Sequence, residues 1–311
     1  MTPTSCALCA ATALSPARET HVDGDVVYTR YECGSCAGEF WWPFQNPGAA
    51  WYERDERYAD RNQDPILTAN KKQTDVLAHA GAAQGPLLDV GCGVGNFLAY
   101  AERCGWEAWG IDFDHDAIEA GKRTFGLTRL SVDDLSSFAA AHPNLRFSLI
   151  TFFDVFEHLD NHAQFLELAK SLLMPGGAIA LSVPYRHGWR FLLPNDFPPR
   201  HLTRWDERSL EIILARHGFS VSYMNRLPAS LYYLALKLRF RFGRWSSVGL
   251  VRRAGGPAAS GRMSLRGRLA RAAAKAKDSV LFGLPALLIY VALLPTRGRY
   301  TDLYAVARLN P

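Results

Sequence analysis

The chain has 311 residues, of which 48% are hydrophobic and 21% are charged, and these proportions exclude a disordered chain. The length allows one main domain with appendages. The formal net charge is +5, but fourteen Lys and Arg residues and a single acid, Asp278, lie between Lys237 and Arg299. A local excess of positive charge of this size is typical of a surface that meets phosphates, on lipid head groups or on nucleic acid.

The N-terminal segment, residues 1–42, contains two Cys-x-x-Cys pairs and little sequence that could form a core. Cys6 and Cys9 are separated from Cys33 and Cys36 by 23 residues. The N-terminus has no basic flank before an apolar run, so no secretory signal is expected and the pairs indicate metal rather than disulfides. Four thiolates form a closed, structural zinc site, which predicts a small zinc ribbon; the alternative is four unliganded thiols.

An alternating pattern of apolar and amphipathic segments follows a linker and a helix that we expect within residues 43–85, near Pro65–Gly81. From Pro86, apolar runs of five to seven residues alternate with amphipathic segments of 10–15 residues. This alternation predicts βαβ units and an α/β fold with a mostly parallel sheet covered by helices on both faces. In this core, residues 86–229, the expected strands are 86–92, 107–112, 127–133, 147–154 and 178–184, and the expected helices are 96–105, 115–126, 135–142 and 161–177. Another helix and strand follow at 206–227, then an insertion at 230–299 and a terminal strand of the core at 300–311.

A glycine-rich turn ends the first strand of this core, in the stretch LLDVGCGVGNF. Gly91, Gly93 and Gly95 permit positive φ and close approach of a ligand to the backbone, and the next helix offers free N–H groups. Asp112 closes the second strand about 20 residues further on, where an acid can accept both hydroxyls of a ribose. The pattern therefore predicts an adenosine-containing ligand at the carboxyl edge of the sheet; the alternative is a turn that only packs.

These residues resemble the class I S-adenosylmethionine-dependent methyltransferases over residues 65–228 and the terminal strand. The matching motifs are Asp89 before GCGVG, the acid that closes WGID, Asp133 after the third strand, DVFEHL after the fourth and LMPGG before the fifth. The resemblance implies a Rossmann-like sheet whose last strand is antiparallel. It also implies that S-adenosylmethionine lies against the glycine turn, with its ribose on Asp112 and its adenine amine near Asp133. The cofactor-binding residues implied in this way are Asp89, Gly91, Cys92, Gly93, Gly95, Asp112, Phe113, Asp133, Asp134 and Asp154.

The candidate catalytic residues are Glu157, His158 and His201. Glu157 and His158 follow the fourth strand, at the same sheet edge as the glycine turn. A neutral hydroxyl acceptor needs a base, and histidine suits this task near neutral pH. The alternative is that His158 caps a helix or braces the loop. His201 lies in a loop that contacts the substrate in many relatives, or it is an ordinary loop histidine.

The insertion departs from a minimal methyltransferase. Two basic segments, 231–245 and 264–279, have the composition of helices, and an uncharged run of 15 residues, Val280–Leu294, follows them. That run is shorter than the roughly 20 residues that cross a bilayer. A basic helix beside an apolar one is typical of a segment that lies on an anionic membrane, here over residues 231–298. A helix packed on the sheet, a lid, or contact with RNA are the alternatives, and the scarcity of aromatic residues after Trp245 disfavours RNA.

The expected function is transfer of a methyl group from S-adenosylmethionine to a small-molecule or lipid-linked acceptor, at an oxygen of a glycan or a secondary metabolite. The N-terminal cysteine pattern resembles that of bacterial methyltransferases that modify sugars, polyketides or lipid-linked glycans. The expected compartment is the cytoplasm, with peripheral contact at the inner face of the membrane. Two rival functions are an RNA methyltransferase with the ribbon as reader and an inactive cofactor-binding scaffold. Cys36 stands where the ribosomal-RNA enzymes usually have histidine, and the intact Asp89 and Asp112 disfavour the scaffold.

Overall fold

A computed structural model of the protein describes residues 2–48, 51, 69–81, 85–188, 196–241 and 280–310. It divides into two compact units. The first comprises Met1–Arg186, Phe197–Leu227 and Asp302–Pro311, and the second comprises His187–Asp196 and Pro228–Thr301. The basic segment 264–279 and most of the expected linker lie outside the described residues.

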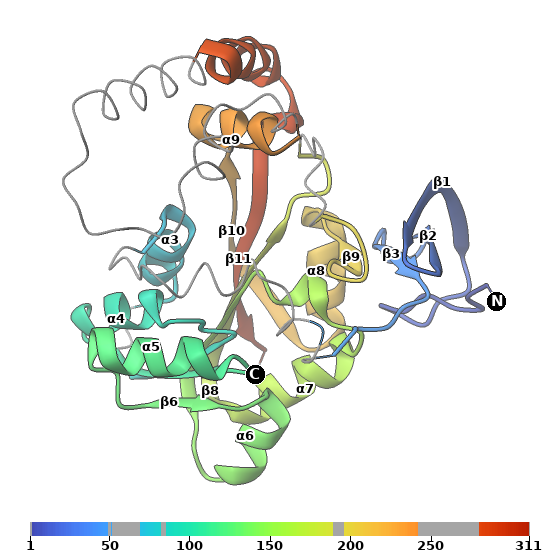
Figure 1. The fold of residues 1–311 in the computed structure, drawn as a ribbon. Helices are drawn as coiled ribbons and strands as arrows, with labels where there is room; N and C mark the ends of the chain where they lie inside the picture. Colours follow the sequence, from blue (N-terminus) through green and yellow to red (C-terminus); the bar gives the residue numbers. More distant parts are fainter. Residues whose placement is uncertain are drawn as a thin grey trace, which may run out of the picture. The chain divides into compact units, whose positions relative to one another are not determined.

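A seven-stranded sheet forms the centre of the first unit, in the order β10-β11-β8-β7-β4-β5-β6 (Figure 1). The five strands β4 to β8 pair with one another in parallel. Strand β11 pairs with β8 in the antiparallel direction. The sheet is therefore Rossmann-like with its last strand antiparallel, as the resemblance implied. The strands are β4 (Pro86–Val90), β5 (Glu107–Asp112), β6 (Leu130–Val132), β7 (Phe147–Phe153), β8 (Leu173–Pro184), β10 (Phe219–Pro228) and β11 (Tyr300–Leu309).

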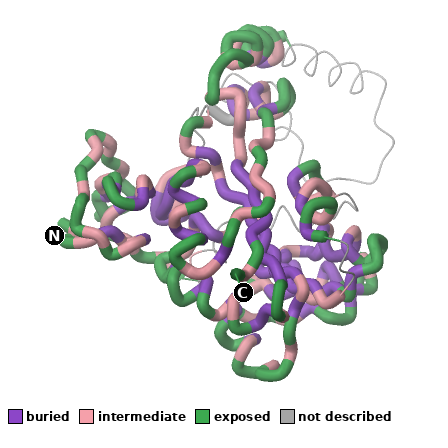
Figure 2. The backbone as a smooth tube through the Cα atoms, turned by 180° about the vertical axis from the view of Figure 1, so that it is seen from behind, coloured by how far each residue is buried: buried purple, intermediate pink, exposed green. Residues whose placement is uncertain are grey.

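Amphipathic helices connect these strands and bury their apolar faces on the sheet. Leu98, Ile118 and Leu149 belong to one cluster of buried side chains, and burial of such side chains stabilises the fold by about 1.5–3 kcal/mol each. Figure 2 shows the buried residues concentrated along the central strands. The helices are α3 (Lys71–His79), α4 (Asn96–Arg103), α5 (His115–Phe125), α6 (Leu135–Ala141), α7 (His162–Leu172) and α8 (Glu207–Arg216).

The helix expected at 161–177 is shorter in the structure. Helix α7 ends at Leu172, and β8 already begins at Leu173. Leu173 pairs with Phe147, and the register then shifts before Ala178 pairs with Leu149. Two residues explain the early end. Pro175 has no N–H to donate, and Gly176 has a φ of +73°, which a helix does not contain.

The N-terminal segment forms a second, four-stranded sheet in the order β1-β2-β3-β9. Its first three strands are consecutive in the chain, but β9 comes from the loop before α8. Glu39 of β3 pairs with Arg204, and Phe40 pairs with Thr203. The sheet of the cysteine segment is thus completed by the loop that carries His201. The strands are β1 (Leu14–Asp23), β2 (Val26–Cys33), β3 (Glu39–Trp42) and β9 (Thr203–Arg204).

The second unit has a small apolar cluster of its own. It contains α9 (Leu231–Arg241) and a helix over residues 280–293. The buried members of the cluster are Ala229, Leu234, Leu238, Phe282 and Ala286. Within the described ranges, no helix combines the length and the apolar character that crossing a bilayer requires.

Candidate active site

The turn after β4 has the conformation that its glycines predict. Gly91, Gly93 and Gly95 have φ values of +75°, +54° and +76°. A Cβ at Gly91 would lie 2.6 Å from Val155 Cγ2, so a larger residue is excluded by sterics as well as by φ. At Gly93 no heavy atom lies within 4 Å of the corresponding position. The turn is therefore tightly packed at its start and open at its tip.

Asp112, at the end of β5, braces this open tip. Its Oδ2 accepts a hydrogen bond of 2.8 Å from the Gly93 N–H, and its Oδ1 accepts one of 2.9 Å from the Asp114 N–H. Burial raises the pKa of the Asp112 carboxyl, although these N–H groups act in the opposite direction. The next residue, Phe113, is 40% exposed, and Val132 at the end of β6 is 45% exposed. A carboxylate and two apolar side chains thus lie at one edge of the sheet.

Asp89 and Cys92 lie beneath the surface of the turn. Asp89 is buried, and its Oδ1 accepts a hydrogen bond of 2.6 Å from Thr151 Oγ1. Burial raises the pKa of Asp89 to about 7, despite the Thr151 hydroxyl. Burial also raises the pKa of the Cys92 thiol well above its usual value. These two buried side chains therefore support the turn from the interior of the protein.

The acids after β6 have separate contacts. The Asp133 N–H donates to the carbonyl oxygen of Asp112 over 3.2 Å, which ties the ends of β5 and β6 together. The Asp134 carboxylate caps α6, since its Oδ1 accepts a hydrogen bond of 2.8 Å from the Ser137 N–H. Asp133 thus lies beside Asp112, whereas the side chain of Asp134 caps the helix that follows it.

Lys72 of α3 is a residue at this edge that the sequence pattern does not single out. It is 5% exposed, and its Nζ donates to Oδ1 and Oδ2 of Asp154 over 2.7 and 2.6 Å. Ser182 Oγ donates to Asp154 Oδ1 over 2.8 Å. The Asp154 side chain is 49% exposed, and the protein atoms packed around it oppose its ionisation, but Lys72 and Ser182 outweigh this effect and hold the pKa of the carboxyl below its usual range. The ion pair also holds Asp154 at a φ of +57°.

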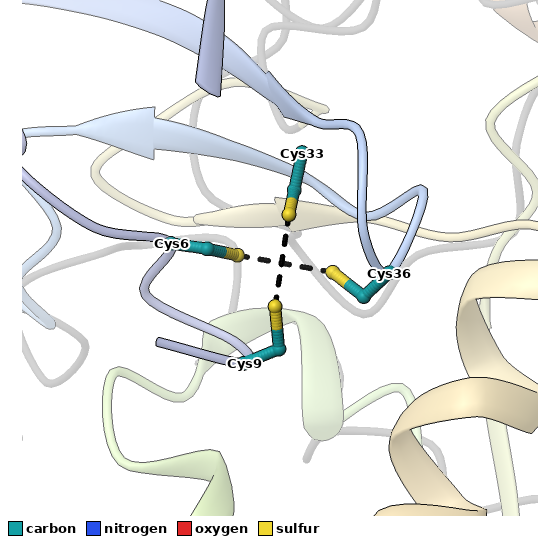
Figure 3. Close-up of side chains that lie close together, drawn as sticks. All are labelled: Cys6, Cys9, Cys33 and Cys36. Atoms are coloured by element: carbon teal, nitrogen blue, oxygen red, sulfur yellow. Dashed lines mark hydrogen bonds between the residues drawn. The ribbon is translucent and has the colours of Figure 1, made fainter. Parts of the chain in front are cut away.

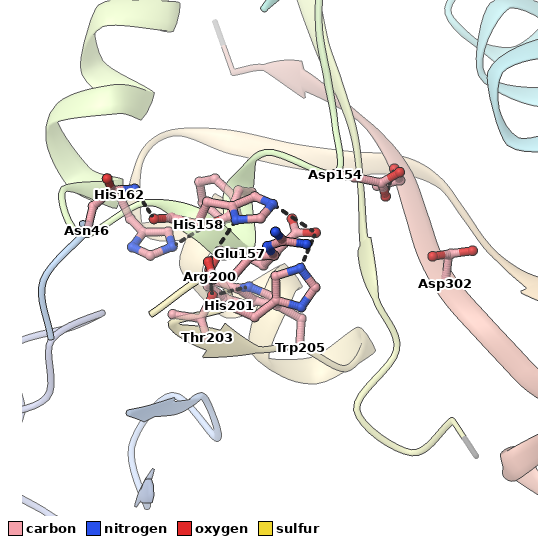
Figure 4. A network of polar contacts seen from close by, with 12 residues as sticks. Asn46, Asp154, Glu157, His158, His162, Arg200, His201, Thr203, Trp205 and Asp302 are labelled. Carbon is pink, nitrogen blue, oxygen red and sulfur yellow. Dashed lines mark hydrogen bonds and ion pairs between the residues drawn. The ribbon is translucent and has the colours of Figure 1, made fainter. Parts of the chain in front are cut away.

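Glu157, His158 and His201 converge after β7 (Figure 4). Glu157 and His158 belong to a 3₁₀ helix, η1 (Phe156–His158). Nε2 of His158 and Nε2 of His201 each lie 3.9 Å from Glu157 Oε1. The two imidazole rings meet edge to face at 4.8 Å. The structure thus brings the three candidate catalytic residues into one cluster, called here the Glu-His-His cluster.

Backbone contacts fix the orientation of this cluster. His158 Nδ1 lies 2.7 Å from the carbonyl oxygen of Arg200, which only accepts, so Nδ1 carries a proton, and in the neutral imidazole the lone pair is on Nε2. The Leu202 N–H donates to the Glu157 carbonyl over 2.8 Å. Glu157 is 1% exposed, and burial followed by the charge of Asp154 raises the pKa of its carboxyl well above the usual value. Among the described residues, no hydrogen-bond partner reaches Glu157 Oε2.

The four N-terminal cysteines also converge (Figure 3). Cys6 Sγ lies 3.8 Å from Cys36 Sγ, and Cys9 Sγ lies 3.6 Å from Cys33 Sγ. A tetrahedral Zn–S₄ site with bonds of about 2.3 Å has sulfur–sulfur edges of about 3.8 Å. These two sulfur–sulfur distances therefore match the edges of a zinc site, and all four sulfur atoms lie within 4.8 Å of one another.

Comparison with known proteins agrees with this architecture. A family model described as a methyltransferase domain matches residues 54–223. A ubiquinone biosynthesis O-methyltransferase of Azoarcus sp. (strain BH72) is 30% identical over 128 residues, which are 40% of this chain and 54% of the relative. That of Saccharophagus degradans is 28% identical over 153 residues, which are 48% of this chain and 63% of the relative. The chain thus spans less than two thirds of the length of these curated relatives.

Solved structures share the fold at low identity. Phosphoethanolamine N-methyltransferase 2 of Haemonchus contortus, in complex with S-adenosyl-L-methionine, has a TM-score of 0.52 and 14% identity, over 94% of this chain and 71% of that one. The cyclopropane synthase MmaA2 of Mycobacterium tuberculosis has a TM-score of 0.51 and 17% identity, over 83% of this chain and 95% of that one. The chain therefore belongs to the methyltransferase-domain family and has the fold of the class I S-adenosylmethionine-dependent methyltransferases.

Proposed function

We propose that the protein transfers the methyl group of S-adenosylmethionine to a hydroxyl oxygen of a small or lipid-linked acceptor. The observation that carries this proposal is the open turn at Gly93, which Asp112 braces at the same sheet edge as the Glu-His-His cluster. The O-methyltransferase names of the curated relatives support oxygen as the methylated atom. Their assignment to ubiquinone biosynthesis supports an acceptor with a lipid tail.

The residues at the turn suit an adenosine-containing cofactor. Asp112 offers carboxylate oxygens to the ribose hydroxyls, and Phe113 and Val132 offer apolar surface to the adenine ring. Asp133, whose backbone is bonded to Asp112, is the acid for the adenine amine. The bound cofactor supplies an activated methyl group on its sulfonium.

The Glu-His-His cluster is positioned to activate the acceptor. Val155, two residues before Glu157, packs against Gly91, so the cluster follows directly from the wall of the cofactor turn. Nε2 of His158 would accept the proton of the acceptor hydroxyl, and the acceptor oxygen would take the methyl group as its bond to the cofactor sulfur breaks. The products are a methyl ether and S-adenosylhomocysteine.

We also propose that Cys6, Cys9, Cys33 and Cys36 hold a structural zinc ion. The sulfur spacing supports this, as does the Leu8 N–H, which donates to Cys6 Sγ over 3.4 Å. Burial acts against the Cys33 thiolate, but the N–H groups of Cys36 and Ser35 outweigh it and lower the pKa of this thiol to about 7. All four coordination positions are filled by sulfur, so this zinc has no place for a substrate.

Calorimetry and methyl labelling test the proposed reaction. Asp112→Asn is expected to weaken S-adenosylmethionine binding by about 10-fold or more, because it removes a charged acceptor. Asp116→Asn changes an acid that is 93% exposed on α5 and serves as the control. The His158→Ala variant is expected to bind the cofactor with unchanged affinity. It is expected to transfer no label from methyl-labelled cofactor to acceptors in a cell extract.

The fate of the label distinguishes the candidate acceptors. Label in the lipid or small polar fraction supports the proposal, and label in RNA overturns the acceptor class. Absence of cofactor binding by the intact protein overturns the methyl transfer itself.

A further inference from the structure

The Glu-His-His cluster has the composition and geometry of a metal site. We propose that Glu157, His158 and His201 bind a divalent transition-metal ion that holds the acceptor hydroxyl; this rests on the proposed methyl transfer. Their three ligand atoms lie within 4.8 Å of one another. Two imidazole nitrogens and one carboxylate suit ions such as Zn²⁺, Fe²⁺, Co²⁺ and Mn²⁺.

The position of the proton on the His158 ring supports a metal ion at this cluster. Its Nδ1–H donates to the Arg200 carbonyl, so in the neutral imidazole the lone pair is on Nε2, which lies 3.9 Å from Glu157 Oε1. A lone pair and a carboxylate oxygen repel each other unless a proton or a metal ion lies between them, and a divalent ion can take this place. In a metal site with bonds of about 2.1 Å, ligand atoms lie about 3.0–3.4 Å apart. The two 3.9 Å distances to Glu157 Oε1 therefore have to close by at least about half an ångström to form the site, and the third pair of ligand atoms, within 4.8 Å, has to close by up to about 1.4 Å.

The burial of Glu157 is the second argument. The side chain is 1% exposed, and among the described residues Oε2 has no hydrogen-bond partner. A buried carboxylate costs several kcal/mol unless a charge or donors compensate it. A divalent ion at Oε1 and Oε2 supplies this compensation.

The surroundings of the cluster are the third argument. Metal-bound histidines usually donate their second ring N–H to a carbonyl or carboxylate, as His158 does to Arg200. The Leu202 N–H donates to the Glu157 carbonyl over 2.8 Å, which joins the His201 loop to η1. Three protein ligands leave coordination positions open for a substrate.

A metal at this place explains how an acceptor hydroxyl becomes a nucleophile. A hydroxyl that binds a divalent ion loses its proton more readily, and the proton passes to solvent water. The resulting oxygen forms its bond to the methyl carbon as the methyl–sulfur bond breaks. His158 then acts as a ligand rather than as the proton acceptor.

Titration of the full chain with Mn²⁺, with one zinc ion per chain so that the cysteine site stays filled, followed by electron paramagnetic resonance of the unbound ion, tests the site. Mn²⁺ avoids thiolate ligands, so the cysteine site does not contribute. One bound Mn²⁺ is expected, with affinity at least about 10-fold lower in Glu157→Gln and in His201→Gln. His115→Gln, at an exposed histidine on α5, is the control. Circular dichroism checks that each variant is folded.

The outcomes separate this proposal from the proposed function. Turnover that chelation abolishes and Mn²⁺ restores, with unchanged S-adenosylmethionine affinity, supports the metal site. Full turnover in the presence of chelator, with no bound Mn²⁺, overturns the metal and leaves methyl transfer standing. Loss of cofactor binding in the untreated protein counts against the methyl transfer instead.

The helix over residues 280–293 in the second unit has one buried face and one exposed apolar face. Its inner face packs on α9, where Phe282 and Ala286 are buried with Leu234 and Leu238. Its other face is apolar and 41–69% exposed at seven positions. These positions are Val280, Leu281, Leu284, Leu287, Leu288, Val291 and Leu294. We name them the apolar face.

We infer that the apolar face docks on an anionic lipid surface. The segment Lys237–Arg299 contains fourteen basic residues and one acid, which complements anionic head groups. The uncharged run Val280–Leu294 has 15 residues and is about 22 Å long as a helix, shorter than the roughly 30 Å hydrocarbon core, so it lies in the interface.

Flotation of the full chain with phosphatidylglycerol-containing vesicles tests the apolar face. Binding is expected to fall with salt, and Leu284→Glu with Leu288→Glu is expected to reduce the bound fraction at least about 10-fold. Val22→Glu, at an exposed valine of β1, is the matched control. Binding that the double variant leaves unchanged overturns the proposal, as does binding to RNA but not to vesicles.

Discussion

Asp89 and Asp112 are neighbours at the end of β4 and β5, but their partners differ. Asp112 accepts two backbone N–H groups beside the open tip of the turn, whereas Asp89 accepts one hydroxyl beneath it. Burial raises the pKa of both carboxyl groups. The pKa of Asp89 reaches about 7, so its proton couples folding to pH near neutrality.

The titration of Asp89 predicts a pH-dependent stability of the cofactor-free protein. Between about pH 4, the unfolded pKa, and the folded pKa of about 7, the folded state keeps a proton that the unfolded state has lost. The free energy of unfolding therefore falls as pH rises through this window and levels off above it. Asp89→Asn removes this dependence, so its stability relative to the native protein is expected to rise by about 3 kcal/mol between pH 5 and pH 8.

Urea unfolding at pH 5, 6, 7 and 8 measures this difference. Asp116→Asn is the control, because that side chain is exposed and should follow the native curve. Parallel curves for Asp89→Asn and the native protein would mean that Asp89 is ionised in the folded state throughout this range.

The element that connects the cysteine segment to the active site is β9. Arg204 of β9 forms two contacts with Glu19 of β1, at 2.7 and 3.0 Å, and the Trp41 N–H donates to the Leu202 carbonyl over 2.9 Å. Asn46 Nδ2 donates to the His158 carbonyl over 2.8 Å. The segment that the cysteines organise therefore holds both sides of the Glu-His-His cluster.

Cys33→Ser is predicted to lower the zinc content to well below one ion per chain and to loosen the loop that carries His201. The physical reason is that zinc binding supplies folding energy to a segment with little core of its own. Zinc analysis and limited proteolysis of the loop measure the two effects. Cys104→Ser is the control, since this cysteine is exposed and lies outside the cluster. Full zinc content in Cys33→Ser would contradict the prediction.

At the scale of the whole molecule, the two units have cores of very different size. The sheet of the first unit buries Leu88, Ile150 and Ala180 completely, along with many other apolar side chains. Among the described residues, the apolar cluster of the second unit has five buried members. Segments with few buried apolar contacts open at lower free energy.

Amide hydrogen exchange is expected to show this difference. The amides of α9 and of the helix at 280–293 should exchange well before those of β7 and β8, because their opening exposes less apolar surface. Mass spectrometry of peptides from the four segments measures the order. Equal protection of all four would show that the two units unfold together.

Several features were predictable from the sequence because they depend on local chemistry. The period of apolar residues predicted the strands and helices, and the glycines at 91, 93 and 95 predicted a turn of positive φ. The fold and the methyltransferase family are confirmed. The roles of the individual site residues, the acceptor and the membrane contact stay predictions. The end of α7 was misplaced, since its apolar residues continue to Met174, whereas the helical backbone ends at Leu172.

By itself, the sequence determined which segments form strands, helices, the glycine turn and the cysteine knuckles, because each of these depends on residues close together in the chain. Only the tertiary structure decided which distant residues meet. Lys72 contacts Asp154, Glu157 lies beside His201, and Glu39 pairs with Arg204. Contacts of this kind depend on strand order and on loop paths, which single-residue propensities and spacing do not encode.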